Sequence, residues 1–180
     1  MTAAAVATAT QSVIGVFGSL SEAETAVRQL DRSGFPIEQV SIVTKDLESE
    51  KEVHGYVTTG DIAARGAGMG VWVGGIFGLL IGAAFIWVPG SGPLLVAGPF
   101  ATALLGALEG AAVGGAGGGL LGALAGLGVS RQHILKYEDA LRAGKYLVIA
   151  HGTSDELSRA RVTLGQSGAA ETTMHPVGTA

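Results

Sequence analysis

The chain has 180 residues, of which 48% are hydrophobic and 14% charged, with a formal net charge of −4 and a mean hydropathy of +0.45. This length suits one domain carrying an insertion, and the mildly acidic balance provides no basic surface for nucleic acid. Because cysteine is absent, disulfides, thiolate catalysis and thiolate metal sites are excluded.

Residues 1–11 lack the positively charged start of a signal peptide. They are expected to form a disordered tail. A first half-domain is expected over residues 12–61. Its segment 12–18 is apolar on both faces, as in a buried strand. A helix follows, with Ser19 and Glu22, or Ser21 and Glu24, as a capping box. Gly34 suits its C-terminal cap, residues 39–45 predict a second strand, and residues 46–60 a polar loop.

The same pattern recurs 134 residues later, within a second half-domain expected over residues 129–177. A helix over 130–144 precedes a strand over 145–152. Thr153 and Glu156 then occupy the capping-box positions of the next helix, and residues 170–177 predict a last strand. Two such β-α-β units predict an α+β fold, a ferredoxin-like split domain.

Between the halves, residues 62–128 are predicted to form an inserted antiparallel helical hairpin. Residues 66–88 are all uncharged and long enough, as a helix, to span a bilayer. The sequence PGSGP at 89–93 predicts the turn, and a second helix is expected over about 100–127. Glycine recurs every fourth residue in both predicted helices, at Gly70, Gly74, Gly78 and Gly82, and at Gly106, Gly110, Gly114, Gly118, Gly122 and Gly126.

Residues four apart lie on one face of a helix, so each glycine series predicts a flat stripe that another helix can approach closely, a glycine zipper. Trp72 and Trp87 stand near the two ends of the first predicted helix, where they would anchor it at two membrane interfaces. Arg65, Arg131 and Lys136 flank the hairpin, whereas its turn has no charge. This asymmetry places the α+β domain on the cytoplasmic side.

Glu109 is the one charge between Arg65 and Arg131. An ionisable group in an apolar helix indicates a buried functional site, or a residue near the headgroups or paired within an assembly. Two alternatives to a membrane span therefore stay open. Hairpins from several copies would form the core of a soluble assembly, or the segment would fold back on its own domain.

No catalytic, metal-binding or cofactor-binding set emerges, and no small-molecule substrate is indicated. The sequence GGGLLG at 117–122 fits the dinucleotide-binding glycine pattern, but it lies inside an apolar helical pattern instead of following a strand. The four histidines share no metal-ligand spacing and are predicted to be surface or rim residues: His54, His133, His151 and His175.

Three stretches resemble the bacterial general stress protein domain, also called the heat-induced stress protein domain. They are SVIGVFGSLSEAETAVRQLDRSGFPIEQVSIVTKD, the turn VPGSGPLLVAGP, and LGVSRQHILKYEDALRAGKYLVIAHG, which together cover about residues 12–155. The resemblance implies a small α+β domain linked to stress responses, with no established catalytic residues.

Together these features predict a stress-associated protein that is not an enzyme. We expect it to anchor in the cytoplasmic membrane and to associate with itself through the glycine-zipper hairpin, with the lipid bilayer and its own copies as partners. The alternative is a soluble, cytoplasmic homo-oligomer, a structural or scaffold protein whose hairpins pack into a shared core.

Overall fold

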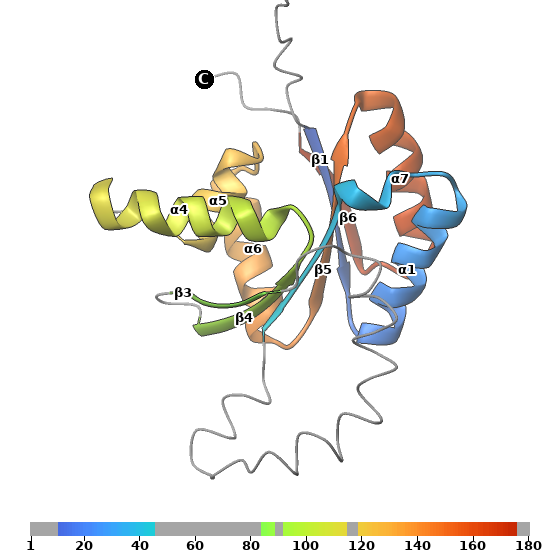
Figure 1. Cartoon of the computed structure of the whole chain (residues 1–180). Coiled ribbons are helices and arrows are strands. Elements are labelled where there is room, and N and C mark those ends of the chain that lie inside the picture. The colour runs from blue at the N-terminus through green and yellow to red at the C-terminus, as the bar shows by residue number, and fades with distance from the viewer. Residues whose placement is uncertain (1–10, 46–83, 89–91, 115–118, 176–180) are drawn as a thin grey trace, which may run out of the picture.

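The computed structural model describes residues 11–45, 84–88, 92–114 and 119–175. Within them, the chain forms a mixed α+β domain of six strands and five α-helices (Figure 1). The elements are β1 (Gln11–Phe17), α1 (Leu20–Arg32), a 3-10 turn (Ile37–Gln39), β2 (Val40–Lys45), β3 (Ala84–Val88), β4 (Gly92–Ala97), α4 (Phe100–Gly114), α5 (Leu120–Gly126), α6 (Arg131–Arg142), β5 (Tyr146–Gly152), α7 (Ser154–Gln166) and β6 (Glu171–His175).

The strands form one sheet in the order β3-β4-β2-β5-β1-β6, and every neighbouring pair is antiparallel. Strand β1 lies between the strands of the second half, with Ile14 opposite Ile149 of β5 and Thr173 of β6. Strand β5 likewise lies between β1 and β2. The two halves predicted from the sequence repeat therefore interleave within one sheet.

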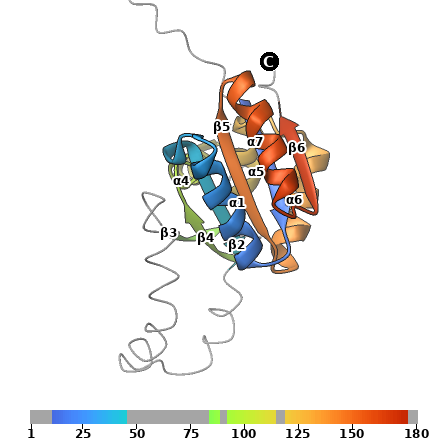
Figure 2. The ribbon, with the colours of Figure 1, turned by 90° about the vertical axis from the view of Figure 1, so that its right-hand side faces the viewer.

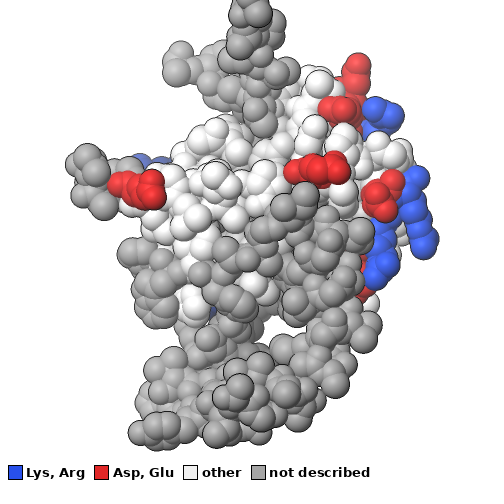
Figure 3. Space-filling model, in the orientation of Figure 1, with Lys and Arg blue, Asp and Glu red and all other residues white. Residues whose placement is uncertain are grey.

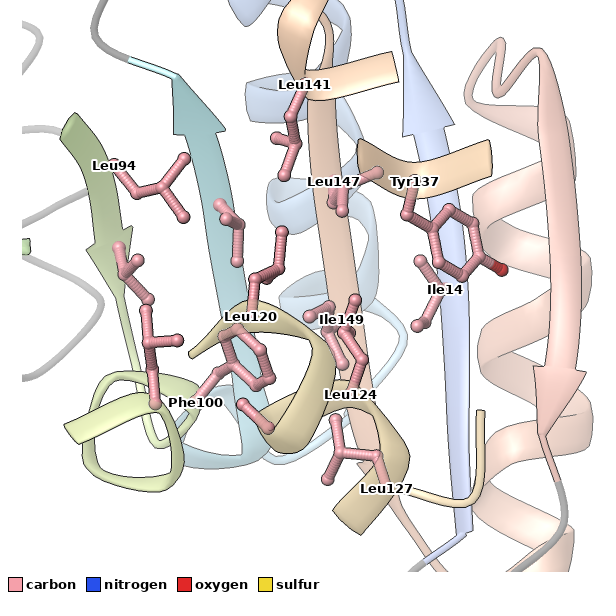
Figure 4. Close-up of a cluster of buried hydrophobic side chains, with 14 of the residues drawn as sticks. Ile14, Leu94, Phe100, Leu120, Leu124, Leu127, Tyr137, Leu141, Leu147 and Ile149 are labelled. Carbon is pink, nitrogen blue, oxygen red and sulfur yellow. The ribbon is translucent and has the colours of Figure 1, made fainter. Parts of the chain in front are cut away.

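Two layers of helices cover the sheet, with α1 and α7 on one face and α4, α5 and α6 on the other (Figures 1 and 2). Alternation along β1 supplies both cores: Val13 and Phe17 pack towards α1 and α7, whereas Ile14 and Val16 face the opposite layer. Figure 4 shows the core on the side of α4, α5 and α6, which these helices and the strands fill together. Its labelled side chains are Phe100, Leu120, Leu124, Leu127, Tyr137, Leu141, Ile14, Leu94, Leu147 and Ile149.

Both predicted capping boxes are confirmed, and they fix the starts of the two helices on the α1 and α7 face. The side chain of Ser19 accepts from the backbone N–H of Glu22, whose carboxylate accepts from the backbone N–H of Ser19. Thr153 and Glu156 repeat this arrangement at the start of α7. These reciprocal bonds satisfy N–H groups that have no partner inside the helix.

The first predicted helix is wrong at its C-terminal end, because residues 84–88 form strand β3. This strand pairs with β4, which in turn pairs with β2, so that Val43 lies opposite Val96. A short apolar run is compatible with either a buried strand or a helix. Here the unpaired edge of β2 decides, since pairing with β4 satisfies backbone groups that a helical hairpin would leave to solvent. The remainder of the first predicted helix, residues 66–83, lies outside the described residues.

The second predicted helix, over 100–127, is not continuous. It divides into α4 and α5, and Gly119 adopts a φ of +75° where α5 begins. Residues 114–119 read GGAGGG, and each glycine in a helix interior is less favourable than alanine by up to about 1 kcal/mol. The stripe expected along one helix is therefore split, with Gly106, Gly110 and Gly114 on α4, Gly122 and Gly126 on α5, and Gly118 outside the described residues.

Candidate functional site

The part of the glycine-rich segment that the structure describes folds back on the chain's own sheet. Along α4, Ala101 and Leu104 are buried against strand residues, and Leu108 is packed against the same core. The segment thus follows, over its described part, the fold-back alternative left open by the sequence. The first glycine series, at Gly70, Gly74, Gly78 and Gly82, lies outside the described residues, as does Trp72.

The opposite side of α4 is exposed, and we call it the α4 outer face: Thr102, Leu105, Gly106 and Glu109. These residues recur at i, i+3, i+4 and i+7, which is one face of a helix. Leu105 is 47% exposed. A Cβ built on Gly106 would have no neighbouring atom within 4 Å. The described end of the second glycine series therefore faces open space, and no side chain of the described chain covers it at Gly106.

Two other predicted site residues take different environments from those expected. Glu109 is exposed on the α4 outer face of the single chain, which does not show the buried environment that was one of the possibilities for it. Trp87 lies in β3, where its register partner is Pro93, and not at the end of a long helix. Of the helices that the structure describes, none is both long and apolar enough to cross a bilayer.

The histidines were predicted to be surface or rim residues, but two of them are buried. His175 is 3% exposed and His151 is 9% exposed. Both lie in register with Ser12, one on each side of β1, so the three side chains form a polar row across the sheet on the side of α4, α5 and α6. His54 lies outside the described residues.

Each member of this polar row is hydrogen-bonded. Ser12 Oγ lies 3.4 Å from the carbonyl oxygen of Leu127. His151 Nδ1 lies 3.2 Å from the backbone carbonyl oxygen of Gln39, and His175 Nε2 lies 2.8 Å from the hydroxyl oxygen of Tyr137. Such bonds offset the free energy lost when polar groups leave water. The row was not predicted, because each of its three polar residues stands near the end of a strand that is otherwise largely apolar. A signal was nonetheless present: Ser12, His151 and His175 each lie two positions along their strand from Ile14, Ile149 and Thr173, and therefore on the same face of the sheet.

His175 belongs to an aromatic cluster with His133 and Tyr137 from α6. The ring centroids of His133 and His175 are 5.0 Å apart, and those of Tyr137 and His175 are 5.8 Å apart, both edge-on. Burial, followed by the nearby His133, lowers the pKa of His175 to about 4. Burial raises the pKa of Tyr137 to about 12. Both groups are therefore neutral near pH 7, and the cluster ties α6 to the edge strand β6.

A separate pocket of about 500 Å³ opens where β5 ends and α7 begins. His151 lines it, and burial lowers the pKa of this imidazole. The pocket walls come from the 3-10 turn, the start of α4, the end of the α5 segment and the start of α7: Glu38, Gln39, Pro99, Phe100, Ala103, Leu127, Gly152, Thr153 and Glu156.

Neither the cluster nor the pocket holds an evident reaction centre. In the part of the chain that the structure describes, no group of three or more His, Asp or Glu side chains is arranged to hold a metal ion. The buried histidines bond to a backbone carbonyl and to a tyrosine hydroxyl, and neither partner is an acidic group that would make the ring a strong base. The geometry is that of polar groups in a packed sheet, beside an accessible pocket.

Among curated proteins and among solved structures, none matches the chain significantly. Residues 12–85 match the family model described as the heat induced stress protein YflT domain. This match spans β1, α1 and β2 and reaches the start of β3. Over that segment it confirms the resemblance found in the sequence.

Proposed function

We propose that this chain is a stress-associated protein that is not an enzyme and that acts by associating with its own copies through the α4 outer face. The family match supports the stress-associated role. The exposed, nearly uncharged face of α4 is the observation that carries the self-association. Membrane attachment is kept as a second candidate.

The α4 outer face combines an exposed leucine with an open glycine. In Figure 3, Lys, Arg, Asp and Glu side chains gather mainly over the helices α1 and α7, while the described surface over α4 is largely uncharged. Burial of apolar area contributes about 25 cal/mol per Å². At Gly106 the absence of a side chain lets a second helix backbone approach closely, which adds dispersion contact and Cα–H···O contact.

A two-fold arrangement suits this face, since the same patch of two copies would meet. The α4 helices of both copies would cross near Gly106, with each Leu105 packed beside the crossing. Glu109 would stay at the rim, where its charge remains in water. Such an interface needs no residue from the α1 and α7 face.

The test is the sedimentation equilibrium of the full chain with and without a charge on this face. The variant Leu105→Glu should weaken self-association by at least about tenfold, because a carboxylate would enter the interface. Val162→Glu is the matched control, since Val162 is 58% exposed on α7. A wild-type chain that stays monomeric, or equal weakening by both variants, would contradict the proposal.

The second candidate is attachment to the bilayer through residues 66–83, which lie outside the described residues. These residues are uncharged and contain the first glycine series at Gly70, Gly74, Gly78 and Gly82. Flotation of the full chain with vesicles of phosphatidylcholine and phosphatidylglycerol tests this attachment. Flotation that Leu105→Glu leaves unchanged would favour attachment, whereas a chain that stays at the bottom of the gradient would speak against it.

We further propose that β2, β5, β1 and β6 form a ferredoxin-like sheet, to which β4 and β3 are added at one edge. The support is the strand order and the two crossovers through α1 and α7. Interstrand nuclear Overhauser effects linking Ile14 with Ile149 and with Thr173 test the arrangement. Direct pairing of β1 with β2 would overturn it.

A further inference from the structure

The pocket at the end of β5 has one feature that no part of the proposed function uses. His151 is 9% exposed, and it is one of the residues that line the pocket. A carbonyl oxygen can only accept a hydrogen bond, so Nδ1 carries the proton shared with the backbone carbonyl of Gln39. The neutral ring then presents the lone pair of Nε2.

This lone pair has no partner within the described chain. No hydrogen bond of His151 Nε2 is formed there, yet every fully enclosed side-chain nitrogen or oxygen in the described part is hydrogen-bonded. Nε2 is therefore not enclosed by protein, and the pocket provides its access. It adds a neutral nitrogen acceptor to a pocket that Glu38 and Glu156 also line.

The charges around the pocket are negative. The carboxylates of Glu38 and Glu156 line it, and among the described lining residues there is no lysine or arginine. The start of α7 would by itself attract an anion. However, Glu156 already occupies that position, because its carboxylate lies 2.9 Å from the backbone nitrogen of Thr153 and 2.8 Å from its hydroxyl oxygen.

The wall on the other side is apolar. It is formed by Pro99 and Ala103 at the start of α4 and by Leu127 after α5. The absence of a side chain at Gly152 lets Glu156 and Gln39 lie close to the end of β5, since a Cβ there would lie 2.9 Å from Glu156 Oε2 and 3.2 Å from Gln39 Oε1. The pocket is within the volume range of small-molecule sites, about 300–1,000 Å³.

We propose that this pocket binds a small organic amine with an apolar body. The protonated amino group donates to His151 Nε2 and lies beside the carboxylates of Glu38 and Glu156. The apolar body contacts Pro99, Ala103 and Leu127. An anionic ligand of the same shape is rejected, because it would face two carboxylates and a nitrogen lone pair.

The experiment is a titration of the full-length, ¹⁵N-labelled chain with 2-phenylethylamine, followed through the imidazole nitrogens at pH 7.5. A ligand of this size is expected to bind with a Kd of about 1 mM. The amine should shift the Nε2 resonance of His151. The matched acid, 3-phenylpropionate, should bind at least about tenfold more weakly. Equal shifts with the amine and the acid, or no shift with the amine, would overturn the proposal.

Two exposed positions test the site without disturbing the core. Ala103→Leu should weaken amine binding at least about tenfold by filling the apolar wall, and Glu38→Gln should weaken it at least about threefold by removing one carboxylate. Asp139→Asn, an exposed acidic residue near the C-terminal end of α6 that does not line the pocket, is the control for Glu38→Gln and should leave the Kd unchanged. Binding that Ala103→Leu and Glu38→Gln leave unaltered places the amine elsewhere and refutes this site. None of these variants changes Leu105, the residue that is replaced in the self-association test. Failure of the amine proposal can therefore be told apart from failure of the self-association proposal.

Discussion

The hydroxyl oxygen of Tyr137 lies 2.8 Å from Nε2 of His175, and this bond joins helix α6 to the edge strand β6. Tyr137 is 1% exposed and packs with Leu141 and Ile134 against the sheet. The last strand of the chain is thus held on one side by its pairing with β1 and on its face by a buried hydrogen bond. The bond matters because an edge strand has only one neighbouring strand to pair with.

Replacing Tyr137 by phenylalanine should lower the free energy of unfolding by about 1–3 kcal/mol. The variant keeps the ring and its packing but leaves His175 buried without this hydrogen-bond partner. Urea denaturation followed by circular dichroism measures the change. Tyr146→Phe is the control, since no hydrogen bond of the Tyr146 hydroxyl is formed within the described residues, and it should change stability by less than about 0.5 kcal/mol. Equal effects of both variants would show that the bond contributes nothing.

Stability should fall as the pH drops from about 6.5 to about 4. The folded-state pKa of His175 is about 4, below the ordinary histidine value, so the unfolded chain binds this proton first and acid favours unfolding. The contribution of His175 is complete above pH 6.5 and amounts to at most about 3 kcal/mol. Burial lowers the pKa of His151 too, so its contribution has the same sign.

The variant His175→Gln isolates this contribution, because glutamine can still bond to Tyr137 but does not titrate. Unfolding free energies measured at several pH values should fall less steeply in the variant than in the natural chain between pH 6.5 and pH 4. Parallel curves for the two chains would mean that His175 has an ordinary pKa in the folded state.

Gly98→Ala should destabilise the chain by more than about 2 kcal/mol. Gly98 has a φ of +95°, and a Cβ there would overlap the carbonyl oxygen of Val40 and lie 2.8 Å from Ser41 Cα. The close approach positions the start of α4, where the backbone N–H of Phe100 donates to Ser41 Oγ at 3.0 Å. Both obstacles are backbone atoms of a central strand, so they cannot move aside cheaply.

Gly34→Ala is the matched control for this prediction. Gly34 also has a positive φ, of +77°, but a Cβ there would meet nothing within 4 Å. Its cost is therefore the conformational strain alone, about 1–2 kcal/mol. Thermal or urea unfolding of both variants separates the clash from the strain. A Gly98→Ala variant no less stable than Gly34→Ala would show that α4 can shift away from β2.

The elements of the two half-domains could be predicted from the sequence because their signals are local. Two pairs of residues spaced three apart, Ser19 with Glu22 and Thr153 with Glu156, each indicate the start of a helix. Gly34 occupies the left-handed position that follows α1. The alternation of Val13, Ile14 and their neighbours fits a strand buried on both faces. None of these signals needs a distant residue.

The strand over residues 84–88 could not be predicted in the same way, because the helical glycine interval ends at Gly82 and the residues that follow have no period that separates helix from strand. Residues 84–88 are uncharged and apolar, which suits either structure. Ser12, His151 and His175 posed a related problem. Each is an unremarkable polar residue near a strand end, and only the register of three strands shows that they share one row.

The sequence by itself determined the capped helices and the strands that flank them, because each depends on residues close together in the chain. Comparison of these local patterns also gave the repeat of the two halves and the family resemblance. The tertiary structure decided where the glycine-rich segment goes. Strand β4 pairs with the free edge of β2, and β3 pairs with β4. Helices α4 and α5 pack on the apolar face formed by β2, β5 and β1. Backbone pairing and burial between distant residues settle that choice, and no local pattern contains them.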